Sequence, residues 1–257
     1  MGPPTRDTAA PHGDATGTIF PYDPPVDHGH GLLTVDGTWH RSPLKRRMTL
    51  IRRSDGALAV HSAIRMRDDD WGAIERLGRV DLVLVPSTLH ADEARHYAER
   101  WRDCRVLVPA AARERLAAKL PRIDATYADG LPRPWPAVLD TAPLAGTRMH
   151  ETLFLHRPSR SLIATDFVFH YASGDLRGLP ALAMRLNGVV GRVAPSRVFR
   201  WLFLTDLAAL RRSLAPVAAW DFDRVVMAHG RIVETGGKAA FEAGLRARFG
   251  RGYKQSK

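Results

Sequence analysis

Short apolar runs separated by polar and glycine-containing segments are the main pattern of the chain. From Leu32 onward the pattern is typical of β-strands, with LLTV followed by MTLIRR and ALAVHSAI. The last two runs flank Ser54-Asp55-Gly56, and an Asp-Gly turn commonly closes a hairpin. These segments predict the opening strands of a first sheet.

Strand and helix patterns then alternate. WGAIERLG is helical in pattern, DLVLVP reads as a buried strand, residues 91–102 as a helix, RVLVPA as a strand and AAARERLAAKL as a helix. Such alternation predicts parallel βαβ units. The five prolines between Pro121 and Pro143 predict mostly loop around a short strand. ETLFLHRPSRSLIATDFVF then predicts a hairpin, DRVVMAHG a final strand and KAAFEAGLRARF a closing helix.

Residues 197–214 combine apolar and basic positions. Apolar side chains recur at helical spacing while arginines interrupt them, which predicts a basic amphipathic helix or helix pair. The apolar set is Val198, Trp201, Leu202, Leu207, Leu210 and Leu214, and the arginines are Arg197, Arg200, Arg211 and Arg212. Core packing, a lid over a site, a dimer contact and a membrane-surface helix all stay open for this segment.

Length and composition favour one folded domain with short extensions. A chain of 257 residues with 45% hydrophobic content can bury one substantial core. Residues 1–30 are rich in Pro, Gly, Asp and His without a period, so we expect a flexible N-terminal arm, a domain over 31–250 and a basic tail over 251–257. No run of 18 apolar residues occurs, and the first residues lack the apolar segment of a secretory signal. The expected location is therefore cytoplasmic, and the single cysteine, Cys104, is expected to be a buried thiol.

The net charge of +11 raises the question of an anionic partner. Arginine supplies 33 of the 38 basic residues, and the short clusters Lys45-Arg46-Arg47 and Arg52-Arg53 have no aromatic residues between them. Because single-stranded nucleic acid is bound through such interleaved aromatic side chains, nucleic-acid binding is not expected. The chain also lacks a P-loop and the G-x-S-x-G elbow of serine hydrolases.

Five potential metal ligands lie at or just beyond the apolar runs that read as strands. Strand ends are where α/β folds build their sites, so repeated His and Asp residues there predict one metal centre. The five residues are His90, Asp92, His150, Asp166 and His229.

The sequences PSTLHADE, HETLFLHRPSRSLIATD and AHG, in this order, resemble the metallo-β-lactamase superfamily. The first motif of that superfamily, H-x-H-x-D-H, aligns with residues 88–93, where Thr88 and Glu93 replace two of its three histidines. The phrases RMTLIRRSDGALAVHSAI, HRPSRSLIATDFVF and RVVMAHG look most like an uncharacterised branch, a domain family of unknown function, and the resemblance spans roughly residues 32–248. It implies a four-layer αββα sandwich with mixed sheets.

The resemblance also implies a ligand set. One metal position would take His90, His150 and Asp166, and the other Asp92, His229 and the bridging Asp166. Zinc is the expected metal, with iron or manganese as alternatives. Because Thr88 replaces a histidine of the motif, the site could hold either one ion or two. Glu93 stays open as a ligand, a second-layer partner or a solvated acid at a helix start, and His61 as a residue that lines the site or a hydrogen-bonded strand histidine.

The chemistry implied by this resemblance is hydrolysis by metal-bound hydroxide. A bound metal lowers the pKa of water from 15.7 to about 7, and Asp92 would orient the hydroxide or accept a proton. The expected substrate is a small molecule, anionic if rim arginines bind it, with an ester, lactone, amide or phosphoester bond. Two alternatives stay open: a non-catalytic metal-binding protein with a degenerate motif, and a di-iron redox protein on the same fold. A homodimer is also open.

Overall fold

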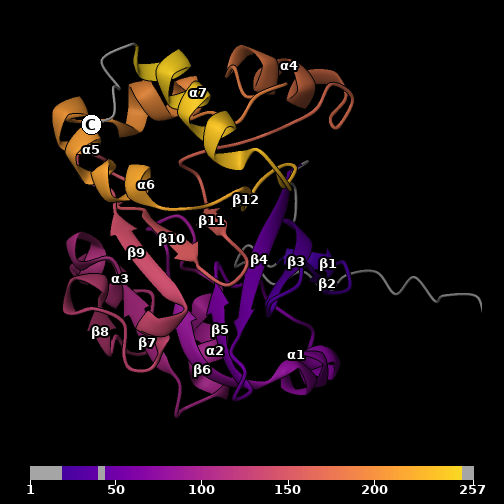
Figure 1. Ribbon diagram of the computed structural model, residues 1–257. Helices are drawn as coiled ribbons and strands as arrows, with labels where there is room; N and C mark the ends of the chain where they lie inside the picture. The colour runs from indigo at the N-terminus through magenta and orange to yellow at the C-terminus, as the bar shows by residue number, and fades with distance from the viewer. Residues whose placement is uncertain (1–18, 40–43, 251–257) are drawn as a thin grey trace, which may run out of the picture.

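Two β-sheets face each other in the computed structural model, and helices cover their outer faces (Figure 1). The structure describes residues 19–39 and 44–250. The predicted basic tail and the first part of the predicted arm lie outside these residues. The rest of the predicted arm contributes two short strands to the first sheet.

The first sheet has eight strands in the order β1-β3-β4-β5-β6-β7-β8, with β2 paired to β3. Pairing is antiparallel from β1 to β5 and parallel from β5 to β8. The hairpin and the βαβ units expected from the sequence are thus confirmed. The strands are β1 (Ile19–Tyr22), β2 (Val26–Asp27), β3 (Leu32–Trp39), β4 (Lys45–Arg52), β5 (Ala57–His61), β6 (Arg79–Leu84), β7 (Arg105–Val108) and β8 (Ala125–Thr126).

The second sheet has four strands in the order β12-β11-β10-β9. The predicted hairpin is β10 with β11, and β12 pairs parallel to β11. Because β11 and β12 are parallel, their carboxyl ends lie at the same edge of the sheet. The strands are β9 (Leu139–Pro143), β10 (Thr152–His156), β11 (Ser161–Ala164) and β12 (Arg224–Met227).

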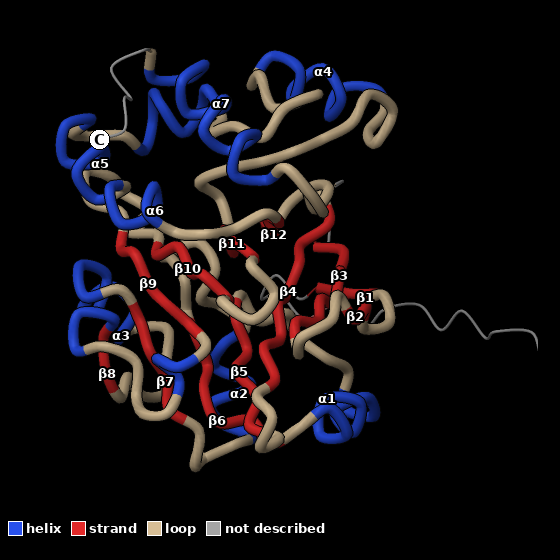
Figure 2. The backbone as a smooth tube through the Cα atoms, in the orientation of Figure 1, coloured by secondary structure: helices blue, strands red, loops and turns tan. Residues whose placement is uncertain are grey.

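The helices lie outside the two sheets, as the tube in Figure 2 shows. α1, α2 and α3 contribute buried side chains to the core on the outer face of the first sheet, and α5, α6 and α7 to the core on the outer face of the second. The helices are α1 (Trp71–Leu77), α2 (Ala94–Arg100), α3 (Arg113–Ala117), α4 (Gly178–Leu186), α5 (Leu207–Ser213), α6 (Ala215–Ala219) and α7 (Gly237–Phe249). Short 3₁₀ turns occupy Asp68–Asp70, Ala110–Ala112, Tyr127–Asp129 and Trp135–Ala137.

The strand alternation explains why the sandwich has three apolar layers. Successive side chains of a strand point to opposite faces. Leu58 of β5 therefore joins the core beneath α1 to α3, whereas Ala59 points between the sheets. In β11, Ile163 meets the same central layer while Leu162 packs under the helices of the second sheet. Both faces of each central strand are buried, which confirms the four-layer αββα sandwich.

The segment 197–214 is a pair of helical turns, one of the two arrangements expected for it. A π-helical turn, η5 (Phe199–Phe203), is followed by α5, and the chain changes direction between them. The amides of Thr205 and Asp206 donate to the carbonyl of Gly146, and the Asp206 carboxylate caps α5 by accepting from two amides. Asp206 is thus an N-cap that starts a new helix, a signal the apolar spacing alone did not reveal.

Candidate metal centre

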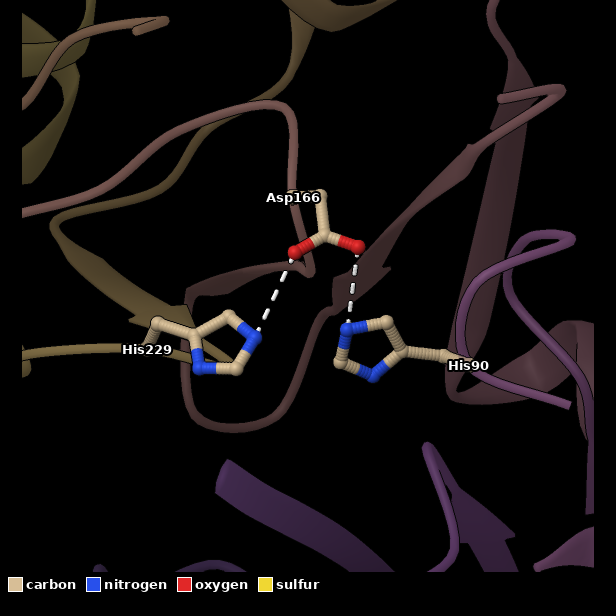
Figure 3. A group of neighbouring side chains, drawn as sticks. All are labelled: His90, Asp166 and His229. Atoms are coloured by element: carbon tan, nitrogen blue, oxygen red, sulfur yellow. Dashed lines mark ion pairs between the residues drawn. The ribbon is translucent and has the colours of Figure 1, made fainter. Parts of the chain in front are cut away.

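Three of the predicted ligands lie close together beyond the ends of strands from both sheets (Figure 3). His90 follows β6, Asp166 follows β11 and His229 follows β12. His90 Nε2 lies 3.0 Å from Asp166 Oδ2, and His229 Nε2 lies 3.3 Å from Asp166 Oδ1. One donor atom from each residue lies within 4.8 Å of the other two. We call these residues the His-Asp-His cluster.

The hydrogen bond of His229 fixes which of its nitrogens faces the cluster. Nδ1 lies 2.8 Å from the carbonyl oxygen of Lys45, which can only accept, so Nδ1 carries the hydrogen. A neutral His229 ring then directs the Nε2 lone pair at the Asp166 carboxylate. Two acceptors at 3.3 Å repel each other unless a cation lies between them or Nε2 is protonated. The ring is held in place by stacking on Phe169, with centroids 5.7 Å apart.

His90 is oriented from its other side by Ser62, which follows β5. The Ser62 hydroxyl lies 2.7 Å from His90 Nδ1 and 3.1 Å from the Arg47 carbonyl. If Nδ1 donates to the hydroxyl and the hydroxyl donates to the carbonyl, Nε2 is free to bind a metal. Burial lowers the pKa of His90 to about 4, so its ring is neutral at pH 7. Ser62 has a φ of 54°, a left-handed conformation that is uncommon for a serine and concentrates at functional sites.

Glu151 positions the loop that carries Asp166. Its fully buried carboxylate accepts from the amides of Thr165 at 2.6 Å, Asp166 at 3.0 Å and Phe167 at 2.8 Å. Burial and the nearby Asp166 raise the pKa of Glu151 to about 8, although the amide donors oppose this. Burial also acts to raise the pKa of Asp166, but the two imidazoles hold it well below its usual value, so Asp166 is an anion.

The start of β4 holds the loop that carries His229. The Arg47 guanidinium donates to the carbonyls of Met227 at 2.8 Å and Gly230 at 3.0 Å, and pairs with Asp36 at 2.7 Å. The Arg47 amide donates to the Ala228 carbonyl. Part of the Lys45-Arg46-Arg47 cluster that suggested an anionic partner is thus a structural element of the site.

We expect Arg47→Met to lower the free energy of unfolding by about 3 kcal/mol, because two carbonyls and one carboxylate lose a charged donor. The matched control is Arg52→Met, on the same strand but exposed, which should change stability by no more than about 0.5 kcal/mol. Urea unfolding measures both. Equal stability of the two variants would show that Arg47 does not hold the His229 loop.

Arg46 places a buried positive charge beside the cluster. Its side chain is 8% exposed, and its Nε and Nη2 have no hydrogen-bond partner in the described residues. Burial lowers the pKa of Arg46, while Asp166, Glu93 and Asp92 act to raise it. A buried guanidinium stays charged when carboxylates surround it. The cluster therefore has a fixed cation next to its carboxylate.

Two predicted ligands lie apart from the cluster. Asp92 Oδ1 accepts from Lys119 at 2.7 Å, and half of the Asp92 side chain is exposed. His150 has a φ of 53°. Burial lowers its pKa, and the nearby Arg115 of α3 lowers it further. Both residues face basic side chains on or just after α3. The structure thus brings together three of the five predicted ligands and leaves two outside.

The remaining predicted site residues lie around the cluster without joining it. The hydroxyl of Thr88 donates to the Met149 carbonyl at 3.2 Å. Glu93 is buried, and its Oε2 lies 3.5 Å from His96 Nε2. His61 is 1% exposed, neither of its ring nitrogens has a hydrogen-bond partner in the described residues, and its ring meets Phe154 edge to face.

His61 should make the protein acid-sensitive. Burial, followed by His90 and Arg46, lowers the pKa of His61 to about 3, so the unfolded chain binds the extra proton below pH 6.5 and stability falls as pH falls. Between pH 7 and pH 5, His61→Leu should lose about 2 kcal/mol less stability than the wild type. Urea unfolding at both pH values checks this. The control is His30→Asn, at an exposed histidine, whose stability should fall between pH 7 and pH 5 as much as that of the wild type. If the stability of His61→Leu falls by the same amount, His61 is not the group that makes the protein acid-sensitive.

Ser62, Glu151 and the β4 basic residues were not identified from the sequence. Ser62 directly follows the candidate His61, and Glu151 directly follows the candidate His150. Their position directly after a candidate site residue was the sequence feature that could have identified Ser62 and Glu151.

Comparison with solved structures identifies the fold. No protein-family model matches the chain, and no curated protein matches it. A metallo-β-lactamase from Pontibacter korlensis aligns with a TM-score of 0.56 at 10% identity, covering 83% of this chain and 93% of that one. One from Erythrobacter litoralis gives 0.54 at 15% identity, covering 86% and 95%. FIM-1 from Pseudomonas aeruginosa, in its mono-zinc form, gives 0.54 at 9% identity, covering 88% and 97%. The resemblance found in the sequence is confirmed at the level of architecture, and the chain has the metallo-β-lactamase fold.

Proposed function

We propose that the protein is a hydrolase that uses one divalent metal ion held by His90, Asp166 and His229. The observation that carries this proposal is the geometry of His229. Its Nδ1–H is committed to the Lys45 carbonyl, so a neutral ring directs the lone pair of Nε2 at a carboxylate 3.3 Å away, whereas a protonated ring donates Nε2–H to it. A metal ion bound by both groups would turn this repulsion into two bonds.

The donor set fits a catalytic metal. Two imidazoles and one carboxylate are three protein ligands, which leave coordination positions open, as catalytic zinc sites do. When bound, such a metal supplies Lewis acidity and lowers the pKa of bound water to about 7. The same donor set also suits iron(II), so an iron-dependent oxidation is the second candidate. FIM-1, a similar structure, is described in a mono-zinc form.

The protein's own residues would prepare the site. Asp166 is held as an anion, Glu151 fixes its loop, and Ser62 fixes the tautomer of His90. Arg46 adds a fixed positive charge that would favour an anionic group of the substrate and disfavour a second metal ion. Asp92, which the superfamily motif suggests as a ligand and catalytic residue, would then act from outside the metal position.

A comparison of Asp92→Asn with Asp166→Asn tests the one-metal proposal. We expect Asp92→Asn to bind zinc within about threefold of the wild type, because its carboxylate is bonded to Lys119 and not to the cluster. Titration calorimetry on metal-free protein gives stoichiometry and affinity. Equal loss of affinity in both variants, or two bound ions in the wild type, would contradict one-metal binding and favour the ligand set implied by the motif.

The hydrolase proposal is tested by turnover. Zinc-, iron- and manganese-loaded proteins should be assayed on ester, lactone, amide, thioester and phosphodiester substrates, with and without a carboxylate or phosphate group. The proposal expects hydrolysis of at least one of these bonds, lost in Asp166→Asn. Oxygen consumption by the iron form without any hydrolysis would favour the second candidate.

A further inference from the structure

The α4 helix exposes an apolar surface that the fold does not cover. Eight of its nine residues, GLPALAMRL, are apolar, glycine or proline, yet none of the nine is buried. Leu179, Leu182 and Leu186 are 81%, 53% and 61% exposed. A helix of this composition is normally buried in a core or faces a membrane. Figure 1 shows α4 at the upper right edge of the molecule, next to α7.

The turn around η5 extends this surface. Trp201 is 74% exposed and Leu202 is 61% exposed. The segment lies against the end of α4, because the Arg197 guanidinium donates to the Leu186 carbonyl at 2.7 Å and the Val198 amide donates to the Asn187 side chain at 3.2 Å. We call α4 and η5 together the α4 face. Its exposed apolar side chains exceed the scattered single residues that a soluble surface normally shows.

The charges on the α4 face itself are all positive, and the two flanking acids are engaged elsewhere, Asp175 with Arg231 and Asp206 as the cap of α5. Residues 176–205 contain five arginines and no Asp or Glu: Arg177, Arg185, Arg192, Arg197 and Arg200. None of the five forms an ion pair with a carboxylate of the described chain. A hollow of about 330 Å³ opens between α4 and the end of α7, lined by Arg185, Arg192, Arg197 and Arg248. A hollow of this size can hold an anionic group.

We propose that the α4 face docks on an anionic lipid membrane surface, with its leucines and Trp201 in the lipid boundary and its arginines on the headgroup phosphates. Apolar side chains flanked by arginines, with tryptophan at the boundary, are the features of interfacial membrane binding. A second copy of the chain fits less well. In a two-fold dimer the same face meets itself, so arginines would meet arginines without any acid between them.

Nucleic acid could satisfy the arginines but would gain nothing from the exposed leucines. The lipid surface accounts for both the charge and the apolar area. No described helix is long or apolar enough to span a membrane, so the contact would lie in the interface plane.

Vesicle flotation of the full protein tests the proposal. The protein should bind vesicles of phosphatidylcholine and phosphatidylglycerol in equal parts, and should bind pure phosphatidylcholine well over ~25-fold more weakly, because each arginine near an anionic surface strengthens binding about fivefold. Leu179→Ser/Leu182→Ser/Trp201→Ser should weaken binding about 100-fold by removing apolar burial. Arg177→Gln/Arg192→Gln should weaken it about 25-fold and reduce its salt dependence.

Matched controls lie outside the α4 face, in β2 and at the start of β7. Val26→Ser removes an apolar residue that is 54% exposed, and Arg102→Gln/Arg105→Gln removes two exposed charges, so both should bind vesicles like the wild type. Equal binding to both vesicle types, or full binding by the leucine variant, would overturn the proposal. So would a dimer in sedimentation that the leucine variant abolishes, or RNA binding that only the arginine variant loses. Competition by free inorganic phosphate without vesicle binding would assign the arginines to a soluble anion and also overturn it.

Discussion

Asp166→Asn is expected to lower zinc affinity by about 100- to 1000-fold. Asp166 is the only carboxylate of the His-Asp-His cluster and lies between both imidazoles, at 3.0 Å and 3.3 Å. Zinc sites with four protein ligands bind with about 10–16 kcal/mol, so one ligand of comparable strength contributes about 3–4 kcal/mol. An amide is a far weaker ligand than a carboxylate. Competition against a zinc chelator measures the change.

The control for Asp166→Asn is the apo protein's stability. The amide keeps the shape of the carboxylate, and the backbone amides of residues 166 and 167 still donate to Glu151. We expect the metal-free variant to remain folded, as judged by circular dichroism. A folded variant with wild-type zinc affinity would show that the metal, if bound, lies elsewhere.

Glu151→Ala is expected to lower the free energy of unfolding by about 4 kcal/mol. Three amides, those of Thr165, Asp166 and Phe167, would lose their acceptor in a fully buried place. Each unsatisfied buried donor costs about 1–3 kcal/mol, and the missing side chain also leaves a cavity. Urea unfolding of the metal-free protein checks this result.

Two further variants separate the role of the Glu151 carboxylate from general truncation. Glu151→Gln keeps the volume but only one acceptor oxygen, so it should lose about half as much stability as Glu151→Ala. Glu75→Ala, which removes an exposed carboxylate paired with Arg100, should lose no more than about 1 kcal/mol. A Glu151→Ala protein as stable as Glu75→Ala would refute the role of Glu151 in fixing the Asp166 loop.

The fold could be predicted because its strands are short, apolar and clearly bounded. Runs such as DLVLVP and SLIA are buried on both faces, so their pattern does not depend on details of packing. The positions of His90, Asp166 and His229 followed from the same logic, since each lies a few residues beyond such a run and parallel strands β11 and β12 end at one edge. Their meeting is a consequence of topology.

The rest of the site depends on loop conformations that no local pattern specifies. His150 was predicted as a ligand, but it has a left-handed backbone, and the next residue, Glu151, is buried against the amide of Thr165 in another loop. Asp92 was predicted as a ligand, and its partner Lys119 lies 27 residues away. The helical spacing of Trp201 and Leu202 left core and surface roles open, and the structure leaves both side chains exposed in a turn before the helix that Asp206 caps. Each difference arises from a contact between segments far apart in the sequence.

Elemental analysis of purified protein is the most direct measurement of the central claim, which is that the His-Asp-His cluster holds one metal ion. The wild type and a His90→Ala/His229→Ala double variant should be purified in parallel and compared for zinc, iron and manganese. The account predicts about one equivalent of metal in the wild type and almost none in a folded double variant. Equal metal content in the two proteins would contradict it.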